Sequence, residues 1–368
     1  MIDRRLIQNF DWYLILITFI LIAVGTVNIY SATYLADTGA GTPIYVKQIY
    51  WAAIGFVFLL MVVLFDYHLL LSLAYPLYGV SLVLLLGVLL FGRTISGSQR
   101  WITFAGFSFQ PSELVKIAMI LTLAKYFFLN ERSDNYRIKD LWIPLALIAV
   151  PALMIMKQPD LGTALLVLLL SFSIILFLGV DWKLLVVSLG GVVIAFPFLW
   201  HLLKDYQKKR ILIFIQPESD PLGAGYHILQ SKIAVGSGSF FGKGFLKGTQ
   251  GQLRFLPEQH TDFAFSVLAE EWGFLGAFIV VTLYLFLLLW SLNIARQAKD
   301  RFGMILALGV TAFFFWQGVI NIGMVLGVVP VVGVPLPFIS YGGSSILASL
   351  LGIGLLLNIN MRRFVIQS

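Results

Sequence analysis

Long apolar runs that recur along the whole chain constrain its fold more than any other feature. About 20 apolar residues are needed for a helix to cross the roughly 30 Å hydrocarbon core of a bilayer. Charged residues make up only 12% of the 368 residues, against about a quarter in a soluble domain. The pattern therefore predicts an all-α polytopic membrane protein with about ten transmembrane helices, forming a single domain over residues 1–368. The predicted spans are residues 12–31, 46–65, 70–91, 112–129, 141–157, 161–180, 183–203, 263–291, 303–328 and 344–361.

The distribution of basic residues between these spans predicts the orientation. Alternate loops carry the excess of Lys and Arg that marks the cytoplasmic side; they contain Arg4, Arg5, Arg132, Arg137, Lys139, Lys183, Arg296, Lys299, Arg301, Arg362 and Arg363. Both termini are therefore expected in the cytoplasm. The first span follows Arg4 and Arg5 without a clear cleavage site, which favours an uncleaved anchor. The long segment 204–262, between the seventh and eighth spans, is then extracytoplasmic.

The 204–262 loop is basic although it is predicted to lie outside. Long loops translocate largely regardless of charge, so this does not overturn the orientation. An anionic ligand would account for the cations, and an ordinary solvated loop is the alternative. The net charge of +7 fits membrane topology and anionic lipid better than nucleic acid, because the basic residues lie in short clusters between apolar runs. The sequence has no cysteine, which excludes disulfides, thiolate metal sites and cysteine nucleophiles.

Acidic residues gather where this loop returns to the membrane. Glu258, His260, Asp262, Glu270 and Glu271 fall within 16 positions, although the whole chain has only 18 Asp and Glu and 4 His. Ionisable groups close to a bilayer are costly and are usually functional, so we place the chemistry in this segment. For Asp262, just before the eighth span, the alternative is a role as a helix N-cap, which Asn would fill nearly as well.

Two predicted helices begin with Gln-Pro followed by an acid. Glu113 and Lys116 are three residues apart and share one face of the fourth span. They either line a wet cavity or form a structural ion pair. Asp160 follows Pro159 at the start of the sixth span, where it either caps the helix or lines the same cavity. All three residues lie on the predicted outer side, below the 204–262 loop.

Glycine and proline mark two further kinds of segment. Residues 220–227 and 236–244 are glycine-rich but match no nucleotide-binding motif. Their backbone amides either cradle phosphate or form tight turns. Between them, residues 226–235 are expected to form a helix on the membrane surface. Residues 329–345 hold three prolines, three glycines and no charge, which predicts a re-entrant-like loop beside the site.

Taken together, these segments resemble the SEDS (shape, elongation, division and sporulation) family of peptidoglycan glycosyltransferases, and within it the elongation branch that determines rod shape. The resemblance covers most of the chain. Its motifs are Gly97–Ile102, Gln110–Lys116, Gln158–Thr163, Asp205–Arg210, Pro217–His227, Gly248–Gln250, Leu256–Phe263, Pro330–Pro337 and Ser340–Gly343.

The resemblance implies an enzyme of the bacterial cytoplasmic membrane, with an outward-facing site that polymerises lipid II into β-1,4 glycan strands. An α-linked donor that gives a β-linked product implies inversion, which needs a base at the acceptor hydroxyl and stabilisation of the departing diphosphate. Asp262 matches the essential aspartate of the family and is the candidate base. Arg210 and loop lysines, or a divalent cation such as Mg²⁺ or Mn²⁺, would stabilise the diphosphate. The other residues expected around the substrate cavity are Glu113, Lys116, Asp160, Arg100, Trp101, Glu258, His260 and Ser340.

The resemblance also implies partners. A class B penicillin-binding protein would crosslink the new strands, together with other membrane proteins of a rod-shape complex. Two other classes of function compete with the glycosyltransferase. A flippase or transporter of lipid-linked cell-wall precursor would also suit ten helices with intramembrane charges, and a non-catalytic scaffold would only position a transpeptidase. The gathering of acids and cations on the outer side favours the enzyme over both.

Overall fold

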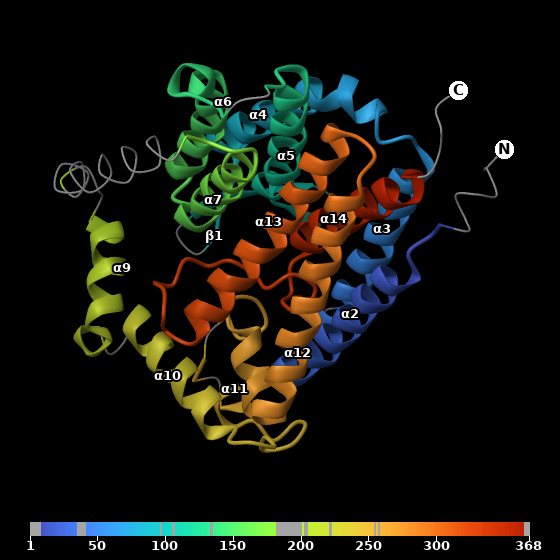
Figure 1. Cartoon of the computed structure of the whole chain (residues 1–368). Helices are drawn as coiled ribbons and strands as arrows, with labels where there is room; N and C mark the ends of the chain where they lie inside the picture. Colours follow the sequence, from blue (N-terminus) through green and yellow to red (C-terminus); the bar gives the residue numbers. More distant parts are fainter. Residues whose placement is uncertain are drawn as a thin grey trace.

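The computed structural model describes residues 9–34, 42–95, 98–104, 107–132, 135–181, 201, 205–220, 223–253, 255–256 and 258–363. Its long helices are α2 (Trp12–Thr33), α3 (Ile44–Leu64), α4 (Leu69–Phe91), α5 (Pro111–Leu129), α6 (Ile138–Lys157), α7 (Leu161–Phe177), α12 (Ala264–Gln297), α13 (Arg301–Val325) and α14 (Gly343–Arg362). The shorter elements are α9 (Asp205–Ile215), the 3-10 turn η1 (Pro217–Ser219), α10 (Ala224–Ser237) and α11 (Thr249–Gln252). In Figure 1, α10 and α11 form the lower end of the molecule, below the bundle of long helices.

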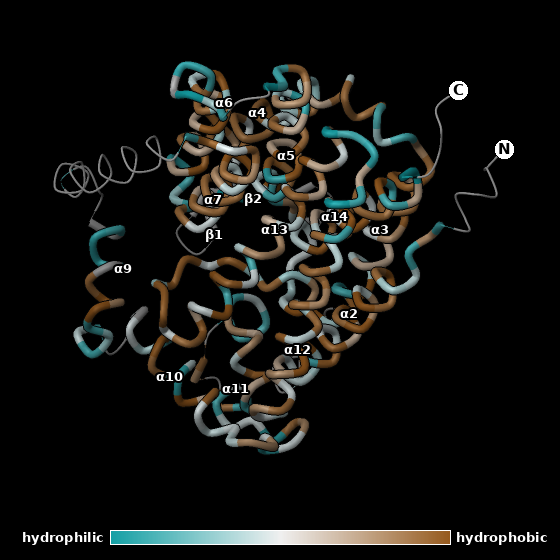
Figure 2. The backbone as a smooth tube through the Cα atoms, in the orientation of Figure 1, coloured by the Kyte–Doolittle hydropathy of each residue, from teal (hydrophilic) through white to brown (hydrophobic). Residues whose placement is uncertain are grey.

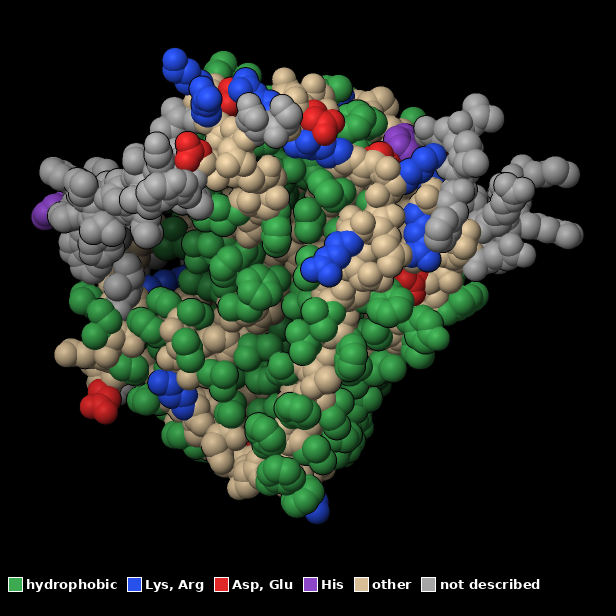
Figure 3. All heavy atoms as spheres, in the orientation of Figure 1, with side chains coloured by type: hydrophobic (Ala, Val, Ile, Leu, Met, Phe, Trp, Pro, Cys, Tyr) green, Lys and Arg blue, Asp and Glu red, His purple; other side chains and the backbone are tan. Residues whose placement is uncertain are grey.

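These helices confirm the predicted all-α membrane fold. Nine of the ten predicted spans coincide with a long helix, and the seventh, 183–203, lies outside the described residues except for His201. Among the described helices, seven are long and apolar enough to cross a membrane. Hydrophobic residues occupy most of the length of these helices (Figure 2). Hydrophobic side chains cover the middle of the face drawn in Figure 3. The total of ten helices stays a prediction.

Helix α14 lies at the centre of the bundle. Nearly all of its residues are buried, and it contacts α2, α3, α5, α12 and α13. A Cβ at Gly354 would lie only 3.2 Å from the backbone of Leu59, so the glycine lets α14 and α3 approach closely. The central position explains why an apolar sequence on all sides is needed here.

The first and last helices meet at one end of the bundle. Asp11 caps α2 through the backbone N–H of Leu14 (3.2 Å). Its other carboxylate oxygen accepts hydrogen bonds from Trp290 Nε1 (2.5 Å) and Asn360 Nδ2 (2.9 Å). The start of α2 and the end of α14 therefore lie together, as an even number of crossings requires. Which side of the membrane they occupy stays a prediction.

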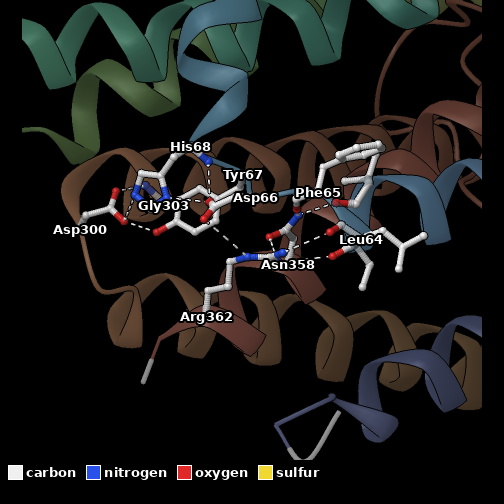
Figure 4. Close-up of polar contacts among 11 residues, drawn as sticks. Leu64, Phe65, Asp66, Tyr67, His68, Asp300, Gly303, Asn358 and Arg362 are labelled. Carbon is white, nitrogen blue, oxygen red and sulfur yellow. Dashed lines mark hydrogen bonds and ion pairs between the residues drawn. The ribbon is translucent and has the colours of Figure 1, made fainter. Parts of the chain in front are cut away.

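A polar network joins two connections and a helix end at the same end of the bundle (Figure 4). His68 Nδ1 lies 2.7 Å from Asp66, and His68 Nε2 lies 3.3 Å from Asp300. Arg362, near the end of α14, lies 3.8 Å from Asp66 and also donates to the side chain of Asn358. The network links the α3–α4 connection, the α12–α13 connection and the end of α14, so it fixes this end of the bundle.

The connection between α4 and α5, for which the sequence analysis predicted no regular structure, contains strands. It forms a three-stranded antiparallel sheet of β1 (Arg93–Ile95), β2 (Ser98–Phe104) and β3 (Phe107–Phe109). Aromatic and β-branched residues on either side of Ala105-Gly106 favour such a hairpin. The sheet fixes the position of Arg100, which lies on β2.

Helix α12 is broken at Gly273, where the sequence predicted a continuous span. Gly273 has φ 66° and ψ −164°, a conformation almost confined to glycine. The loop 238–244 pairs with both sides of the break. Lys243 and Gly244 donate backbone hydrogen bonds to the carbonyls of residues 270 and 271, while the N–H groups of residues 274 and 275 donate to residues 239 and 240. The glycine-rich stretch 236–244 therefore forms a tight turn. Its backbone supplies hydrogen-bond partners for the N–H and C=O groups that the break in α12 leaves unpaired.

Replacing Gly273 with alanine should destabilise the protein severely. The positive φ alone costs about 1–3 kcal/mol, and the added Cβ would lie 2.2 Å from the backbone nitrogen of Gly242. We expect the detergent-purified Gly273→Ala variant to unfold several degrees below wild type in a thermal melt. Gly79→Ala is the matched control, because nothing lies within 4 Å of its Cβ position. Equal melting of the two variants would contradict the role given to Gly273.

Candidate active site

Asp262 lies in a tight turn immediately before α12. The turn begins at Glu258, which has φ +50°. The Glu258 carbonyl accepts hydrogen bonds from the N–H groups of Thr261 (3.1 Å) and Phe263 (3.3 Å). The N-cap of α12 is Phe263, and it makes no side-chain capping bond. Asp262 is therefore not the helix cap that the sequence offered as an alternative.

The carboxyl of Asp262 rests against a non-helical segment between α13 and α14. Residues 326–342 contain no helix, close to the predicted 329–345 loop. A Cβ added at Gly333 would lie 3.2 Å from Asp262 Oδ2, and Gly333 has φ +70°. The next residue, Val334, accepts a hydrogen bond from Asn321 Nδ2 on α13 (2.7 Å). Glycine at position 333 thus leaves space for the carboxyl.

Two further elements approach the same segment from other directions. Arg210, on α9, donates from Nη1 to the carbonyl of Val331 at 3.4 Å. Gly162, in the first turn of α7, has a Cβ position only 2.4 Å from the carbonyl of Val332. Residues 331–334 therefore bring together α7, α9, α13 and the Asp262 turn.

Asp160 caps α7 and also binds a cation. Its carboxylate accepts from the backbone N–H of Thr163 (3.1 Å), from the Thr163 hydroxyl (2.9 Å) and from Gln110 Nε2 (3.1 Å). Arg100 Nε lies 3.5 Å from the carboxylate, and an Nη of the same guanidinium donates to the carbonyl of Pro159 (2.8 Å). The capping interpretation of Asp160 is thus correct, and the same carboxylate holds Arg100 at the site.

The electrostatic field around Asp262 combines burial with charges of both signs. The Asp262 side chain is half-buried, and the loss of surrounding water raises the pKa of its carboxyl. The neighbouring carboxylates of Glu258 and Asp160 raise this pKa further. The guanidinium groups of Arg100 and Arg210 act in the opposite direction, and the resulting pKa is about 6. A carboxyl with this pKa is mostly ionised at neutral pH yet is a stronger base than an ordinary aspartate.

Three other predicted cavity residues have distinct positions. Glu258 is exposed, and its carboxylate accepts from the Thr261 hydroxyl (3.1 Å). His260 is half-buried, with its ring centroid 5.9 Å from that of Tyr341. Trp101 follows Arg100 on β2 and is half-buried, at the point where the pairing of β2 with β1 shifts its register. Glu258 is exposed to water and close enough to Asp262 to raise the pKa of its carboxyl.

Glu113 and Lys116 form a buried ion pair on α5. Lys116 Nζ lies 2.8 Å from Glu113 Oε1 and 3.5 Å from Gln317 Oε1. The lysine is 0% exposed and the glutamate 3%. The structure therefore supports the ion-pair interpretation rather than the predicted contact with an open cavity.

Ser340 also lies within the fold rather than on a cavity surface. It is buried, its hydroxyl oxygen accepts from the backbone N–H of Leu336 (2.9 Å), and its own N–H donates to the Leu336 carbonyl (3.0 Å). Ser340 closes a turn in the 326–342 connection, which is why the position is polar.

Glu270 and Glu271 belong to the framework and not to the Asp262 cluster. Glu270 Oε1 accepts from Lys243 Nζ (2.6 Å) and from the backbone N–H of Thr249 (2.8 Å). Glu271 Oε1 accepts from the Ser31 hydroxyl (2.5 Å). Both carboxylates are buried. Glu270 links the segment 243–250 to the first part of α12, and Glu271 links α2 to it. Of the acids that the sequence analysis grouped together, Glu270 and Glu271 therefore have partners apart from Asp262.

Sequence reasoning missed Asn321 and Gln317. Both are fully buried on α13. Gln317 Nε2 donates to the Pro335 carbonyl (3.0 Å), one residue beyond the carbonyl bound by Asn321. Two amides four residues apart share one face of a helix. Polar residues repeated on one face of an apolar span were the signal that could have revealed them.

The described residues do not form a metal site at Asp262. Among them, no three His, Asp or Glu side chains lie close enough together to hold a metal ion. A divalent cation bound to substrate phosphates needs only one or two carboxylates from the protein, so the cation that the resemblance implies stays a prediction.

The chain belongs to the FtsW/RodA/SpoVE family of cell cycle proteins, because residues 11–364 match that family. Among its relatives, it is 46% identical over 288 residues to the peptidoglycan glycosyltransferase MrdB of Escherichia coli K12, covering 78% of this chain and 77% of MrdB.

Solved structures show the same similarity. A chain in a peptidoglycan synthase complex, studied for the coordination of polymerisation and crosslinking, shares 34% identity with a TM-score of 0.84. The match covers 96% of this chain and 98% of that one. The crystal structure of the rod-shape-determining protein RodA of Thermus thermophilus shares 31% identity with a TM-score of 0.71, covering 97% and 98% of the two chains.

The raised pKa of Asp262 predicts a stability effect that is independent of activity. A carboxyl whose pKa rises from 3.8 to about 6 on folding destabilises the folded state at neutral pH by up to about 3 kcal/mol, less whatever water screens. We expect Asp262→Asn to melt at a higher temperature than wild type at pH 7.5. The gain should vanish near pH 4, where the aspartate is protonated in the folded protein. A lower melting temperature at pH 7.5 would contradict this electrostatic account.

Proposed function

We propose that the chain is a peptidoglycan glycosyltransferase that polymerises lipid II at Asp262. Membership of the FtsW/RodA/SpoVE family and the similarity to MrdB support the activity. The observation that carries the assignment of the site is the position of Asp262. Its carboxyl has a raised pKa and is influenced by two arginines, at the edge of a bundle of apolar helices.

In the proposed reaction Asp262 is the general base. Its carboxylate takes the proton from the 4-hydroxyl of an incoming lipid II. The hydroxyl oxygen then bonds to the anomeric carbon of the growing strand, on the face opposite the diphosphate. The bond from that carbon to the diphosphate oxygen breaks, undecaprenyl diphosphate leaves, and the α-linkage becomes β. A positioned base of this kind contributes roughly 10²–10⁴-fold to the rate.

The leaving group already carries negative charge, so it needs cations more than a proton donor. Arg100 and Arg210 are close enough to Asp262 to lower its pKa. Both guanidinium groups are tied to backbone carbonyls, Arg100 to Pro159 and Arg210 to Val331. Such preorganised charge stabilises a developing anion without reorganising during the reaction. We therefore propose that the diphosphate of the growing strand binds next to Arg100 and Arg210.

We propose partners and a setting that follow from the same activity. The solved complex that couples polymerisation to crosslinking supports a class B penicillin-binding protein as partner. Lipid II would enter from the bacterial cytoplasmic membrane, with both termini of this chain in the cytoplasm and the Asp262 site facing outward. Other membrane proteins of a rod-shape complex complete the proposed assembly.

Replacing Asp262 with asparagine should abolish most polymerisation. The change keeps size and hydrogen bonding but removes the basicity, so we expect at least about a hundredfold loss of rate. The measurement uses purified protein reconstituted with labelled lipid II, with and without a class B penicillin-binding protein, and resolves glycan products on a gel. Asp66→Asn, at the other end of the bundle, is the matched control and should retain activity.

Two outcomes would contradict this assignment. Near wild-type polymerisation by Asp262→Asn would remove Asp262 as the base and make Glu258 the next candidate. Translocation of lipid II without polymer, by wild type with its partner present, would favour the flippase.

A further inference from the structure

Asn321 is a buried polar residue in an otherwise apolar part of α13. Its side chain is 0% exposed, with Ile320 and Ile322 beside it in the sequence. A buried amide is destabilising by about 1–3 kcal/mol in proteins unless it is hydrogen-bonded. The structure therefore has to provide partners for it.

Both amide hydrogens of Asn321 are used. Nδ2 donates to the carbonyl of Asp262 at 2.9 Å and to the carbonyl of Val334 at 2.7 Å. Because both partners are carbonyl oxygens, only the NH₂ group of the amide can face them, which fixes its orientation. A single side chain thus joins the turn that carries Asp262 to the segment on which its carboxyl rests.

The peptide bond after Asp262 is held at both of its polar groups. Asn321 binds its C=O, and its N–H, from Phe263, donates to the Glu258 carbonyl at 3.3 Å. A peptide unit fixed at both groups cannot rotate freely, so it restrains the backbone from which the Asp262 side chain projects. Asn321 also holds the carbonyl of Val334. Val334 is next to Gly333, and Gly333 lies against the Asp262 carboxyl.

We propose that Asn321 is a positioning residue that aligns the Asp262 carboxylate with the acceptor hydroxyl by clamping the Asp262 and Val334 carbonyls together. The inference rests on the proposed function, because it assigns a role in placing the base. Asn321 itself touches no reacting atom. Its effect is on geometry, where a displacement of about 1 Å at a catalytic group can cost about a hundredfold in rate.

The test compares two Asn→Leu substitutions. Asn321→Leu removes the clamp but keeps the branching of the side chain at Cγ. Asn358→Leu is the matched control: Asn358, labelled in Figure 4, is 1% exposed on α14 and also donates to two backbone carbonyls, those of Val62 and Phe65. Asn321→Leu loses two hydrogen bonds, and Asn358→Leu loses three because Asn358 also accepts from Arg362, so the control is at least as disruptive to folding. Only Asn321 contacts the Asp262 turn.

We expect Asn321→Leu to lower kcat for lipid II polymerisation by about 10–100-fold per folded molecule, with KM within about threefold of wild type. The acidic limb of its pH profile should move to lower pH, because a loosened carboxyl gains water and its pKa falls toward the ordinary aspartate value. Asn358→Leu should melt at a lower temperature than wild type but keep the wild-type kcat and pH profile.

Equal kcat and an unshifted profile in Asn321→Leu, compared per folded molecule with Asn358→Leu, would overturn the proposal. If Asn321→Leu does not fold, Asn321→Ser supplies the same readout with a smaller replacement that cannot bridge both carbonyls. Failure of the proposed function gives a different result, in which wild type makes no polymer and Asp262→Asn matches it. With wild type active, the Asn321 comparison supports or refutes the positioning role by itself.

Discussion

The need to satisfy backbone hydrogen bonds between α13 and α14 organises the centre of this protein. Non-helical backbone within a membrane fold is tolerated only where protein or a wet cavity satisfies it, because each unpaired group costs several kcal/mol. In the 326–342 connection, side chains from four helices provide the donors. The carbonyls of Val331, Val334, Pro335, Pro337 and Ser340 accept from Arg210, Asn321, Gln317, Tyr284 and Gln48, respectively. Two of these donors also affect Asp262, since Arg210 lowers the pKa of its carboxyl and Asn321 donates to its carbonyl. The side chains that satisfy this non-helical backbone therefore also form part of the site.

The carboxylates of residues 262 and 270 serve two separate purposes. Glu270 is surrounded by donors from one loop, with Lys243 Nζ and two backbone N–H groups within 3.2 Å of its carboxylate, as expected of a group that stabilises the fold in its charged form. Asp262 has the opposite balance, since burial and neighbouring acids outweigh the two arginines and raise its pKa. Strong hydrogen bonds to the carboxylate of Asp262 would lower its pKa and make it a poor base. Its incomplete stabilisation is therefore what suits it to proton transfer.

Hydropathy was sufficient to predict most of the helices, because the bilayer dictates their length. Features that depend on contacts distant in sequence were not predictable. Gly273 and Gly276 look alike within one apolar run, yet only Gly273 breaks α12, because the loop 238–244 pairs with its neighbours. Spacing placed Glu113 and Lys116 on one face but could not distinguish a cavity from a buried ion pair. The role of Asp262 came from a family resemblance, whereas its separation from Glu270 and its clamp by Asn321 required the structure.

The central claim is that Asp262 works as a base with a raised pKa, and the pH dependence of wild-type lipid II polymerisation tests it most directly. Because the carboxyl must be ionised to accept a proton, kcat/KM should fall about tenfold per pH unit below an apparent pKa of about 6, and it should be flat from there toward neutral pH. Residual activity of Asp262→Asn should lack this limb. A wild-type profile that stays flat down to pH 5, or that Asp262→Asn reproduces, would contradict the account.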